Sequence, residues 1–446
     1  MDNTEDLKAK AQAAIDRRRD WLIDIAKSVL QNPEPGFQEK RTSQLVREKL
    51  GELGIKHESG IALTGIKGYL RGSKPGPTVA VMGELDSVKV LGHPHADPKT
   101  GAAHACGHHC QIGMLLGAAL GLTAPRVIDA LSGTVALMAL PAEEFIDVEY
   151  RWGLHQEGAL GLMSGKQEFI RLGAFDDVDM AMMVHTSASA QDGHFAVGGT
   201  SNGHLVKYIT FLGKAAHAGV APHEGVNALN AAMVALNALS AQRETLRNDD
   251  VARLHGILIR GGTAVSSVPA DVRYEGRVRA RDADAIADAN ARMDRCLRAG
   301  ALAVGAKVNI VTIPGYLPLV NDQGLMDVFR ENAVRLVPHS RVITHRNDLN
   351  RGGSTDMGDL SQIMPVVHPY TGAATGSGHG TDYLIRDYDQ AVIKPAKALA
   401  MSVIDLLADG AARAKEVLAK SPPRMTKDQY VAMQSQRLSE ERYEGK

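Results

Sequence analysis

Apolar residues recur every three or four positions near the start of the chain. Within residues 5–31 this spacing joins Leu22, Ile25, Ala26, Val29 and Leu30, and the proline-containing segment that follows ends it. A second such run covers residues 43–54 and stops at a glycine. This spacing places apolar side chains on one face of a helix, so the chain is predicted to open with two helices.

Shorter runs of β-branched and other apolar residues follow, and they are typical of buried strands. They cover residues 65–71, 78–82, 133–140 and 178–184, with an apolar helix predicted over 112–122. Three of these runs lead into acidic or imidazole side chains, namely Asp86, the pair Glu143 and Glu144, and His185. Open α/β sheets hold ligands at the carboxyl ends of their strands, so this pattern predicts one site along a sheet edge.

The pattern changes near residue 201. Strands are predicted over 205–212, 254–260, 272–280 and 307–313, and helices over 228–246 and 282–299. The order βαββαβ is that of a ferredoxin-like unit. We therefore expect an α/β fold in which residues 1–201 and 318–446 form one domain, with a mixed central sheet flanked by helices. Residues 202–317 are expected to form an inserted ferredoxin-like α+β domain.

Composition narrows the class of protein. The 446 residues are 44% hydrophobic and carry a formal net charge of -1, which argues against disorder and against a basic surface for nucleic acid. The opening residues are polar and charged, and no later apolar stretch is long enough to span a bilayer. We expect a cytoplasmic protein with neither membrane nor nucleic-acid partners. Its three cysteines do not make a disulfide framework.

Histidine and cysteine side chains, which are possible metal ligands, are concentrated in one loop bounded by glycines. Residues 92–111 contain five histidines and two of the three cysteines, which are His93, His95, His104, His108, His109, Cys106 and Cys110. Single histidines are usually explained by packing, but thiolate and imidazole groups at this density are what a transition metal selects. The loop is therefore predicted to bind metal.

Five short motifs in this order carry a resemblance to a known family. They are HACGH at 104–108, the pair Glu143 and Glu144 after Pro-Ala, His185 after a strand, GKAAHA at 213–218, and a late histidine, His379. In these motifs the whole chain resembles the aminoacylase-like metallopeptidases, metallopeptidase family twenty. The resemblance is greatest to the branch that contains p-aminobenzoyl-glutamate hydrolases and indoleacetyl-amino-acid hydrolases.

The resemblance implies roles for individual residues. It implies five metal ligands, which are Cys106, His108, Glu144, His185 and His379. It further implies that Glu143 is the catalytic base, that Asp86 orients a ligand, and that His217 reaches the site of a neighbouring subunit. The inserted domain would then serve as a lid and as the contact of a homodimer or higher homo-oligomer. The implied cofactor is a divalent metal ion, Mn or Zn, with one or two ions per subunit.

Two departures from the family pattern bear on the metal and the substrate. His109, Cys110 and Gln111 follow the HACGH motif, where the branch usually has Asp and then another His, so the number of ions stays open. The segment 145–152 replaces a glycine-rich stretch. It contains Tyr150 and Arg151, which together with Arg260 on the lid are candidates for binding a small anionic substrate. An arginine can make two parallel hydrogen bonds to a carboxylate.

The motifs favour a metal-dependent hydrolase of carbon–nitrogen bonds. In the first hypothesis, water activated by the metal attacks an N-acyl or N-aroyl amino acid amide, with Glu143 as general base and then general acid. An alternative is hydrolytic deamination of an aromatic amine such as 5-nitroanthranilate, the reaction of one relative on this scaffold, which releases ammonia. A second alternative is a non-catalytic metal-binding scaffold protein, although the presence of Glu143 favours catalysis.

Overall fold

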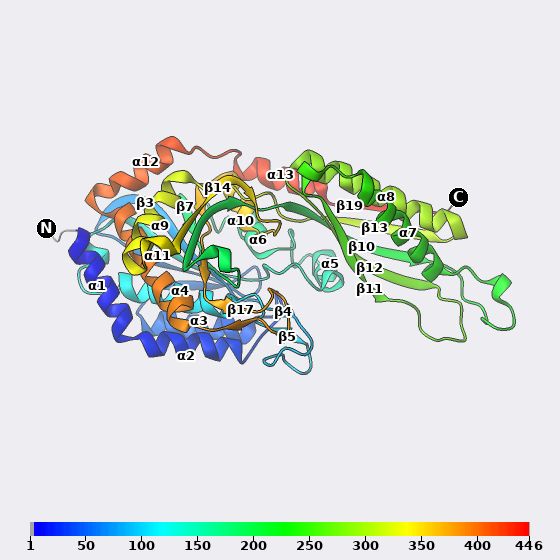
Figure 1. Ribbon diagram of the computed structural model, residues 1–446, viewed down its shortest axis with the longest axis horizontal. Coiled ribbons are helices and arrows are strands. Elements are labelled where there is room, and N and C mark those ends of the chain that lie inside the picture. The colour runs from blue at the N-terminus through cyan, green and yellow to red at the C-terminus, as the bar shows by residue number, and fades with distance from the viewer. Residues whose placement is uncertain (1–3, 446) are drawn as a thin grey trace.

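The computed structural model describes residues 4–445 and contains two units side by side along its long axis (Figure 1). The first is built on a six-stranded sheet in the order β1-β2-β6-β3-β7-β15. The strands are β1 (His57–Ile61), β2 (Gly65–Arg71), β3 (Lys74–Glu84), β6 (Ser132–Leu140), β7 (Met180–Met182) and β15 (Val366–Val367). β3 runs parallel to both β6 and β7, whereas β2 is antiparallel to β1 and β6. The sheet is mixed, as predicted.

Helices cover both faces of this sheet because side chains alternate along its central strands. Val79 and Val81 belong to the core shared with one group of helices, whereas Ala80 and Met82 belong to the opposite core. The first group comprises α1 (Thr4–Arg17), α2 (Arg19–Leu30), α3 (Lys40–Glu52), α4 (His108–Leu122), α9 (Gln323–Leu336) and α11 (Lys394–Leu407). The second comprises α6 (Gly165–Leu172), α10 (Met357–Ile363) and α13 (Lys427–Arg437). α12 (Ala412–Lys420) follows α11.

Two predicted helix boundaries differ from the structure. The single helix expected over residues 5–31 is divided at Arg18, whose backbone leaves helical geometry with φ -113° and ψ 20°. α4 begins at His108 and not at residue 112, so the last four residues of the histidine-rich loop, 108–111, form its first turn.

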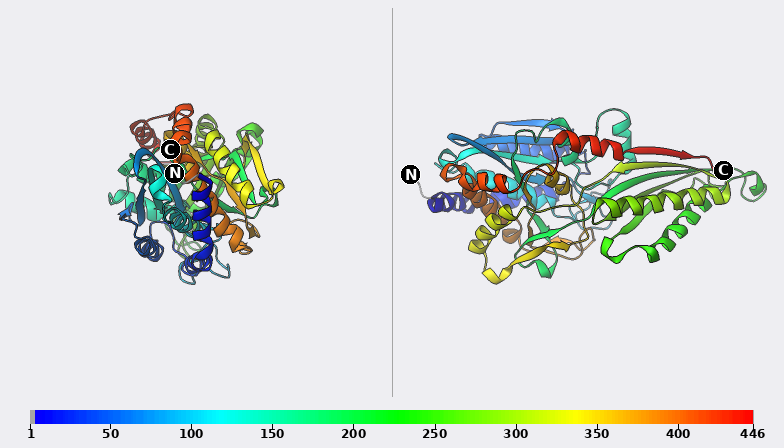
Figure 2. Two further views of the ribbon diagram at one scale, coloured as in Figure 1. Left: turned by 90° about the vertical axis from the view of Figure 1, so that its left-hand side faces the viewer. Right: turned by 90° about the horizontal axis from the view of Figure 1, so that it is seen from above.

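The second unit has the predicted βαββαβ order. Its elements are β10 (Gly203–Leu212), α7 (Ala228–Gln242), β11 (Arg253–Arg260), β12 (Asp271–Ala280), α8 (Ala283–Val304) and β13 (Lys307–Pro314). They form an antiparallel sheet in the order β11-β12-β10-β13, with α7 and α8 on one face (Figure 2). This is the strand order of a ferredoxin-like unit.

The end of the chain returns to this second sheet. β19 (Ser439–Tyr443) pairs with β13 and becomes the fifth strand. Residues 439–443 therefore lie with the inserted unit, whereas they were expected within the first domain. The pairing is physically reasonable because β13 would otherwise be an open edge of the sheet.

The units meet through the face of the second sheet that α7 and α8 leave free. Val206, Tyr208, Val311 and Ile313 on that face pack against Phe145, Val148, Met163 and Tyr316. Val148 begins the short helix α5 (Val148–Gln156), which directly follows the glutamate pair. A contact between the two units thus lies beside the predicted catalytic residues.

Small sheets complete the first unit. β8 (His185–Ser187), β9 (Phe195–Thr200), β14 (Val342–Asn350) and β16 (Tyr370–Gly372) form a four-stranded sheet. β4 (Val88–Lys89) pairs with β5 (Ala102–Ala103), and β17 (Ala374–Thr375) pairs with β18 (Leu384–Ile385). Across residues 4–445, no helix is both long and apolar enough to cross a membrane.

Candidate active site

A tight turn before α4 brings Cys106 and His108 to the edge of the central sheet. Gly107 between them has φ +94°, a conformation that side chains rarely adopt. A Cβ at this position would lie 1.9 Å from Thr186 Oγ1. Glycine is therefore required here, and the turn lets a thiol and an imidazole two residues apart serve one centre.

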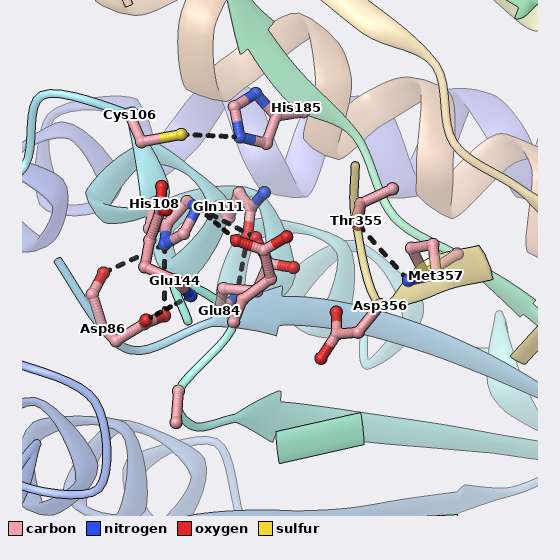
Figure 3. A network of polar contacts seen from close by, with 12 residues as sticks. Glu84, Asp86, Cys106, His108, Gln111, Glu144, His185, Thr355, Asp356 and Met357 are labelled. Carbon is pink, nitrogen blue, oxygen red and sulfur yellow. Dashed lines mark hydrogen bonds and ion pairs between the residues drawn. The ribbon is translucent and has the colours of Figure 1, made fainter. Parts of the chain in front are cut away.

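All five predicted ligands lie together, and we call them the Cys106 cluster: Cys106, His108, Glu144, His185 and His379. Cys106 Sγ is 3.3 Å from His185 Nε2 (Figure 3), and Glu144 Oε1 is 3.0 Å from His379 Nε2. The donor atoms of Cys106, His108 and His185 lie within 4.8 Å of one another, and those of Cys106, Glu144 and His379 do so as well. The thiol thus belongs to two possible ligand triads.

Asp86 connects two members of the cluster. Its Oδ2 accepts a hydrogen bond of 2.8 Å from the backbone N–H of Glu144. Its Oδ1 and its backbone oxygen lie 3.3 and 3.0 Å from His108 Nδ1 (Figure 3). Asp86 is fully buried, so it fixes the ring of His108 and the chain at Glu144 together. The orienting role that the resemblance implied for Asp86 stays a prediction.

Glu84 is a carboxylate at the site that the sequence interpretation missed. Its Oε2 lies 3.1 Å from His108 Nε2, and its backbone N–H donates to Gln111 Oε1 over 2.8 Å. Glu84, His108 and Glu143 also have ligand atoms within 4.8 Å of one another. The available signal was its position, two residues before Asp86 at the end of the same strand.

A buried lysine neutralises this carboxylate. Lys166 Nζ lies 2.5 Å from Glu84 Oε1 and 2.5 Å from Asp356 Oδ1, and all three side chains are buried. Burial alone would lower the pKa of Lys166, but the charges of Asp356 and Glu84 outweigh it and raise that pKa. Nothing in the sequence indicated this triad, because its members come from three distant segments.

The donors of the cluster fit a divalent metal ion. Burial and Glu144 would raise the pKa of the Cys106 thiol, but His185 and His108 outweigh them and lower it to about 6, so thiolate is accessible near neutral pH. Within the described chain, the buried His108 Nε2 makes no hydrogen bond of suitable geometry, although Glu84 Oε2 lies 3.1 Å away. A thiolate with imidazoles and a carboxylate is a donor set that zinc accepts, and manganese accepts its nitrogen and oxygen members.

Two of the three predicted substrate-binding residues are engaged elsewhere. Arg151 is buried and donates to the backbone oxygens of Ala142, Glu144, Ile146 and Met163. Its guanidinium group therefore holds the backbone around the glutamate pair and is not free to bind a substrate carboxylate. Arg260 lies at the outer end of β11, where it pairs with Asp271 over 2.5 Å. Tyr150 lines a cavity of about 810 Å³ between the two units.

His217 lies on the second unit and is exposed to solvent. Its Nδ1 accepts hydrogen bonds from the backbone N–H groups of Gly219 and Val220, over 3.2 and 3.1 Å. Within residues 4–445 no hydrogen bond or ion pair joins His217 to the Cys106 cluster. An action at the site of another subunit therefore stays a prediction.

Arginines on β12 supply positive charge that the sequence interpretation did not identify. Arg277 and Arg279 point from the free face of the second sheet toward the first unit, where Arg277 donates to the backbone oxygen of Phe145 and Arg279 to Ser354 Oγ. Burial and Arg277 lower the pKa of Arg279 to about 10, while Glu144 and Glu143 oppose this change. The alternation of charged and apolar residues in DVRYEGRVRA was the signal that could have revealed this face.

Comparison with known proteins shows which family this chain belongs to. The family model for the peptidase dimerisation domain matches residues 200–304. Thermostable carboxypeptidase 2 of Saccharolobus solfataricus is 31% identical over 335 residues, which cover 72% of this chain and 79% of the relative. The chain belongs to the M20 peptidase family. This confirms the relationship that the five motifs indicated.

Two further M20-type comparisons cover nearly the whole chain. Xaa-Arg dipeptidase of Mus musculus is 29% identical over 420 residues, which cover 90% of this chain and 89% of the relative. The fold also matches a dinuclear metal-binding M20 peptidase of Bacillus subtilis, with a TM-score of 0.62 and 22% identity over 88% of this chain and 99% of that one. This M20 protein is accordingly a hydrolase that acts on carbon–nitrogen bonds.

Proposed function

We propose that this M20 hydrolase uses a divalent metal ion to cleave the amide of an N-acyl or N-aroyl amino acid. The observation that carries the proposal is the convergence of Cys106, His108, Glu144, His185 and His379, with Glu143 beside them. Relatives named as a carboxypeptidase and a dipeptidase support an amide between an acyl group and an amino acid.

The cluster would hold the metal through thiolate, imidazole and carboxylate groups. Cys106 belongs to both ligand triads, so the cluster offers donors that would hold one or two ions, with manganese or zinc as the candidates. A divalent ion there would supply the positive charge that makes a water molecule acidic near neutral pH.

Glu143 is the residue that would move protons. Its Oε2 is 3.9 Å from His108 Nε2, so the carboxyl group faces the cluster. It would take a proton from the attacking water and deliver it to the amide nitrogen. The carbon–nitrogen bond then breaks, the carbonyl carbon keeps the hydroxyl of the water, and the amine leaves protonated. Tyr316 donates to the backbone oxygen of Glu143 and holds the base in place.

The second unit would complete the site. We assign the substrate carboxylate to Arg279, because it faces the first unit and is close enough to Glu143 and Glu144 for their charges to affect its pKa. His217 would reach the site of the other subunit in a homodimer and donate to the oxygen that becomes negative during attack. The match to a peptidase dimerisation domain over residues 200–304 supports that assembly.

A product assay on purified, metal-analysed protein tests this function. The substrates would be N-acetyl and N-benzoyl amino acids together with 5-nitroanthranilate, and both amino acid and ammonia would be measured. The proposal expects release of amino acid from the amides. Release of ammonia from the aromatic amine alone would favour deamination, and no turnover of either class by metal-loaded protein would favour a non-catalytic scaffold.

A further inference from the structure

Arg151 joins the glutamate pair to the helix that follows it. It lies on α5, and its buried guanidinium group donates to the backbone oxygens of Ala142 and Glu144, one on either side of Glu143. Because the N–H donors of a guanidinium group lie in one rigid plane, these hydrogen bonds fix the chain before and after the base relative to α5. Residues 142–152 are therefore held as one piece, which we call the glutamate segment.

The side chain directly after the glutamate pair is packed against the second unit. Phe145 is only 1% exposed, and it shares a buried apolar cluster with Val206 and Tyr208 of β10. Its ring centroid lies 6.1 Å from that of Tyr316, in the chain that returns from the second unit to the first. Buried side chains are close-packed, so Phe145 cannot change its place relative to β10 without opening a gap. The position of the second unit thus determines where the chain leaves Glu144.

Three side chains of β12 make polar contacts with the glutamate segment. Arg277 donates to the backbone oxygen of Phe145. Arg273 forms an ion pair with Glu149 on α5. Glu275 Oε1 accepts a hydrogen bond of 3.1 Å from the backbone N–H of Glu149. These three residues of β12 alternate along the strand, so their side chains lie on the same face of the sheet. This face of the second unit therefore holds the segment at Phe145 and at the first turn of α5.

The glutamate pair itself lies between contacts to both units. Asp86 of the first unit accepts a hydrogen bond of 2.8 Å from the backbone N–H of Glu144, and Tyr316 donates to the backbone oxygen of Glu143. The contacts to the second unit come from residues 145–152, which stand where the family pattern has a glycine-rich stretch. Glycines have no side chains that could reach β10 or β12. The link between the second unit and the glutamate pair is therefore a consequence of this chain's own sequence.

We propose that Arg273 and Arg277 are positioning residues that set the place of the glutamate pair beside the Cys106 cluster. They act through the glutamate segment and do not touch the reacting atoms. This inference rests on the proposed amide hydrolysis and deepens it. A catalytic group displaced by about 1 Å can cost about 100-fold in rate. Loss of these contacts is therefore expected to lower kcat, while the metal and the substrate still bind.

Substituting Arg277 tests its role in the working enzyme. Arg277→Leu removes the donor to Phe145, and kcat for N-benzoyl amino acids is expected to fall about 10- to 100-fold with KM changed less than about twofold. Arg277→Lys keeps a cation that can donate to the same oxygen, so most of the activity should return. Arg298→Gln, which alters an exposed pair with Glu441 on the same unit, should match the wild type. A higher KM with unchanged kcat would overturn the inference, because Arg277 would then bind substrate.

A double-mutant cycle tests whether Arg273 acts through Glu149. Arg273→Leu and Glu149→Leu should each lower kcat by about 2- to 5-fold, less than the loss at Arg277, because this ion pair is partly exposed. The double variant should be no worse than the poorer single variant, since both substitutions break one contact. Losses that multiply would show two independent effects and would contradict a joint action through α5.

The fluorescence of Trp152 reports on the glutamate segment without any turnover. Trp152 lies on α5 and packs against the cluster that contains Phe145. The chain has two tryptophans, so Trp21→Phe leaves Trp152 as the only one. In that background and without substrate, Arg277→Leu is expected to shift the emission to longer wavelength, because the segment loosens and water reaches the indole. Arg298→Gln should leave the emission unchanged.

The two measurements together separate this inference from the proposed reaction. A lower kcat together with a shifted emission in Arg277→Leu supports positioning through the glutamate segment. A change in only one of the two, or in neither, would overturn the inference and leave amide hydrolysis by the wild type standing. A shifted emission in a protein whose wild type hydrolyses no amide would refute the proposed reaction, while the link between the segment and the second unit would stand.

Discussion

Glu143 and Glu144 are neighbours in the chain, yet their carboxyl groups face different partners and their pKa values move in opposite directions. Glu144 lies 3.0 Å from His379, and although burial acts against it, the charge and hydrogen bond of this histidine lower the pKa of Glu144. Burial raises the pKa of Glu143, and the charges of Glu84 and Glu144 raise it further. Two acidic groups whose environments separate their pKa values are suited to different tasks.

Substituting each glutamate should separate these tasks. Glu143→Gln is expected to retain bound metal and to lose about 10²–10⁴-fold in kcat, because an amide cannot take the proton from water. Glu144→Gln is expected to lose metal, since Glu144 is one of the predicted ligands in the Cys106 cluster. Metal content measured by mass spectrometry, with activity on the same samples, checks both outcomes. Equal metal content in the two variants would refute the division of roles.

Removing the buried lysine should destabilise the first unit. Lys166→Met leaves Glu84 and Asp356 buried without their shared counter-charge, which is expected to cost about 3–5 kcal/mol in the free energy of unfolding. Adding Asp356→Asn should recover part of that loss. Lys420→Met, which removes an exposed pair with Glu416, should leave the free energy of unfolding nearly unchanged, because solvent screens that pair. Urea unfolding measures all three, and equal effects of the two lysine substitutions would contradict the buried triad.

Asp359 should make stability depend on pH in a defined direction. Burial raises its pKa to about 7, whereas an aspartate in the unfolded chain has a pKa of about 4. Between these values the folded protein holds a proton that the unfolded chain has released. The stability from this group is therefore complete below about pH 4 and is lost as the pH rises through 7.

The comparison with Asp359→Asn isolates this contribution. The asparagine variant should gain stability relative to the wild type as the pH rises from 5 to 8, because it has no proton to lose. Its acceptor oxygen can still receive the hydrogen bonds from Tyr430 and Gln434, each 2.8 Å in the wild type. Asp428→Asn, at an exposed position of α13, is the control. A pH-independent difference between wild type and Asp359→Asn in melting temperature would contradict the assignment.

Mixed dimers test whether His217 acts across subunits. Glu143→Gln and His217→Ala are each expected to be nearly inactive, but a dimer with one copy of each would contain one site with both groups intact. Random pairing after dissociation and reassembly should restore about a quarter of wild-type activity. Absence of recovery, in a sample shown by native mass spectrometry to contain mixed dimers, would place His217 in its own subunit's site or outside catalysis.

The sequence revealed those parts of the molecule that depend on local patterns. The βαββαβ order followed from alternating apolar runs, and the strand ends placed Asp86, Glu144 and His185 at one edge. Motifs of the family placed His379 with them, although it lies far along the chain. These features are predictable because each leaves its signal within a few consecutive residues.

Features that depend on long-range packing were not predictable. Lys166 meets Glu84 only because α6 packs on the sheet, and β19 joins β13 although strands at a chain end have many possible partners. Arg151 was predicted to bind substrate because it follows the base and an arginine can bind a substrate carboxylate with two hydrogen bonds. Its burial beneath the glutamate pair, where backbone oxygens take its N–H groups, could be known only from the tertiary structure.

Metal dependence of amide hydrolysis is the most direct test of the proposed function. Protein freed of metal with a chelator would be assayed on N-benzoyl amino acids before and after addition of Mn²⁺ or Zn²⁺, with metal content determined at each step. We expect activity to disappear with the metal and to return with one or two equivalents of one of these ions per subunit. Undiminished amide hydrolysis by metal-free protein would contradict a catalytic centre built on the Cys106 cluster.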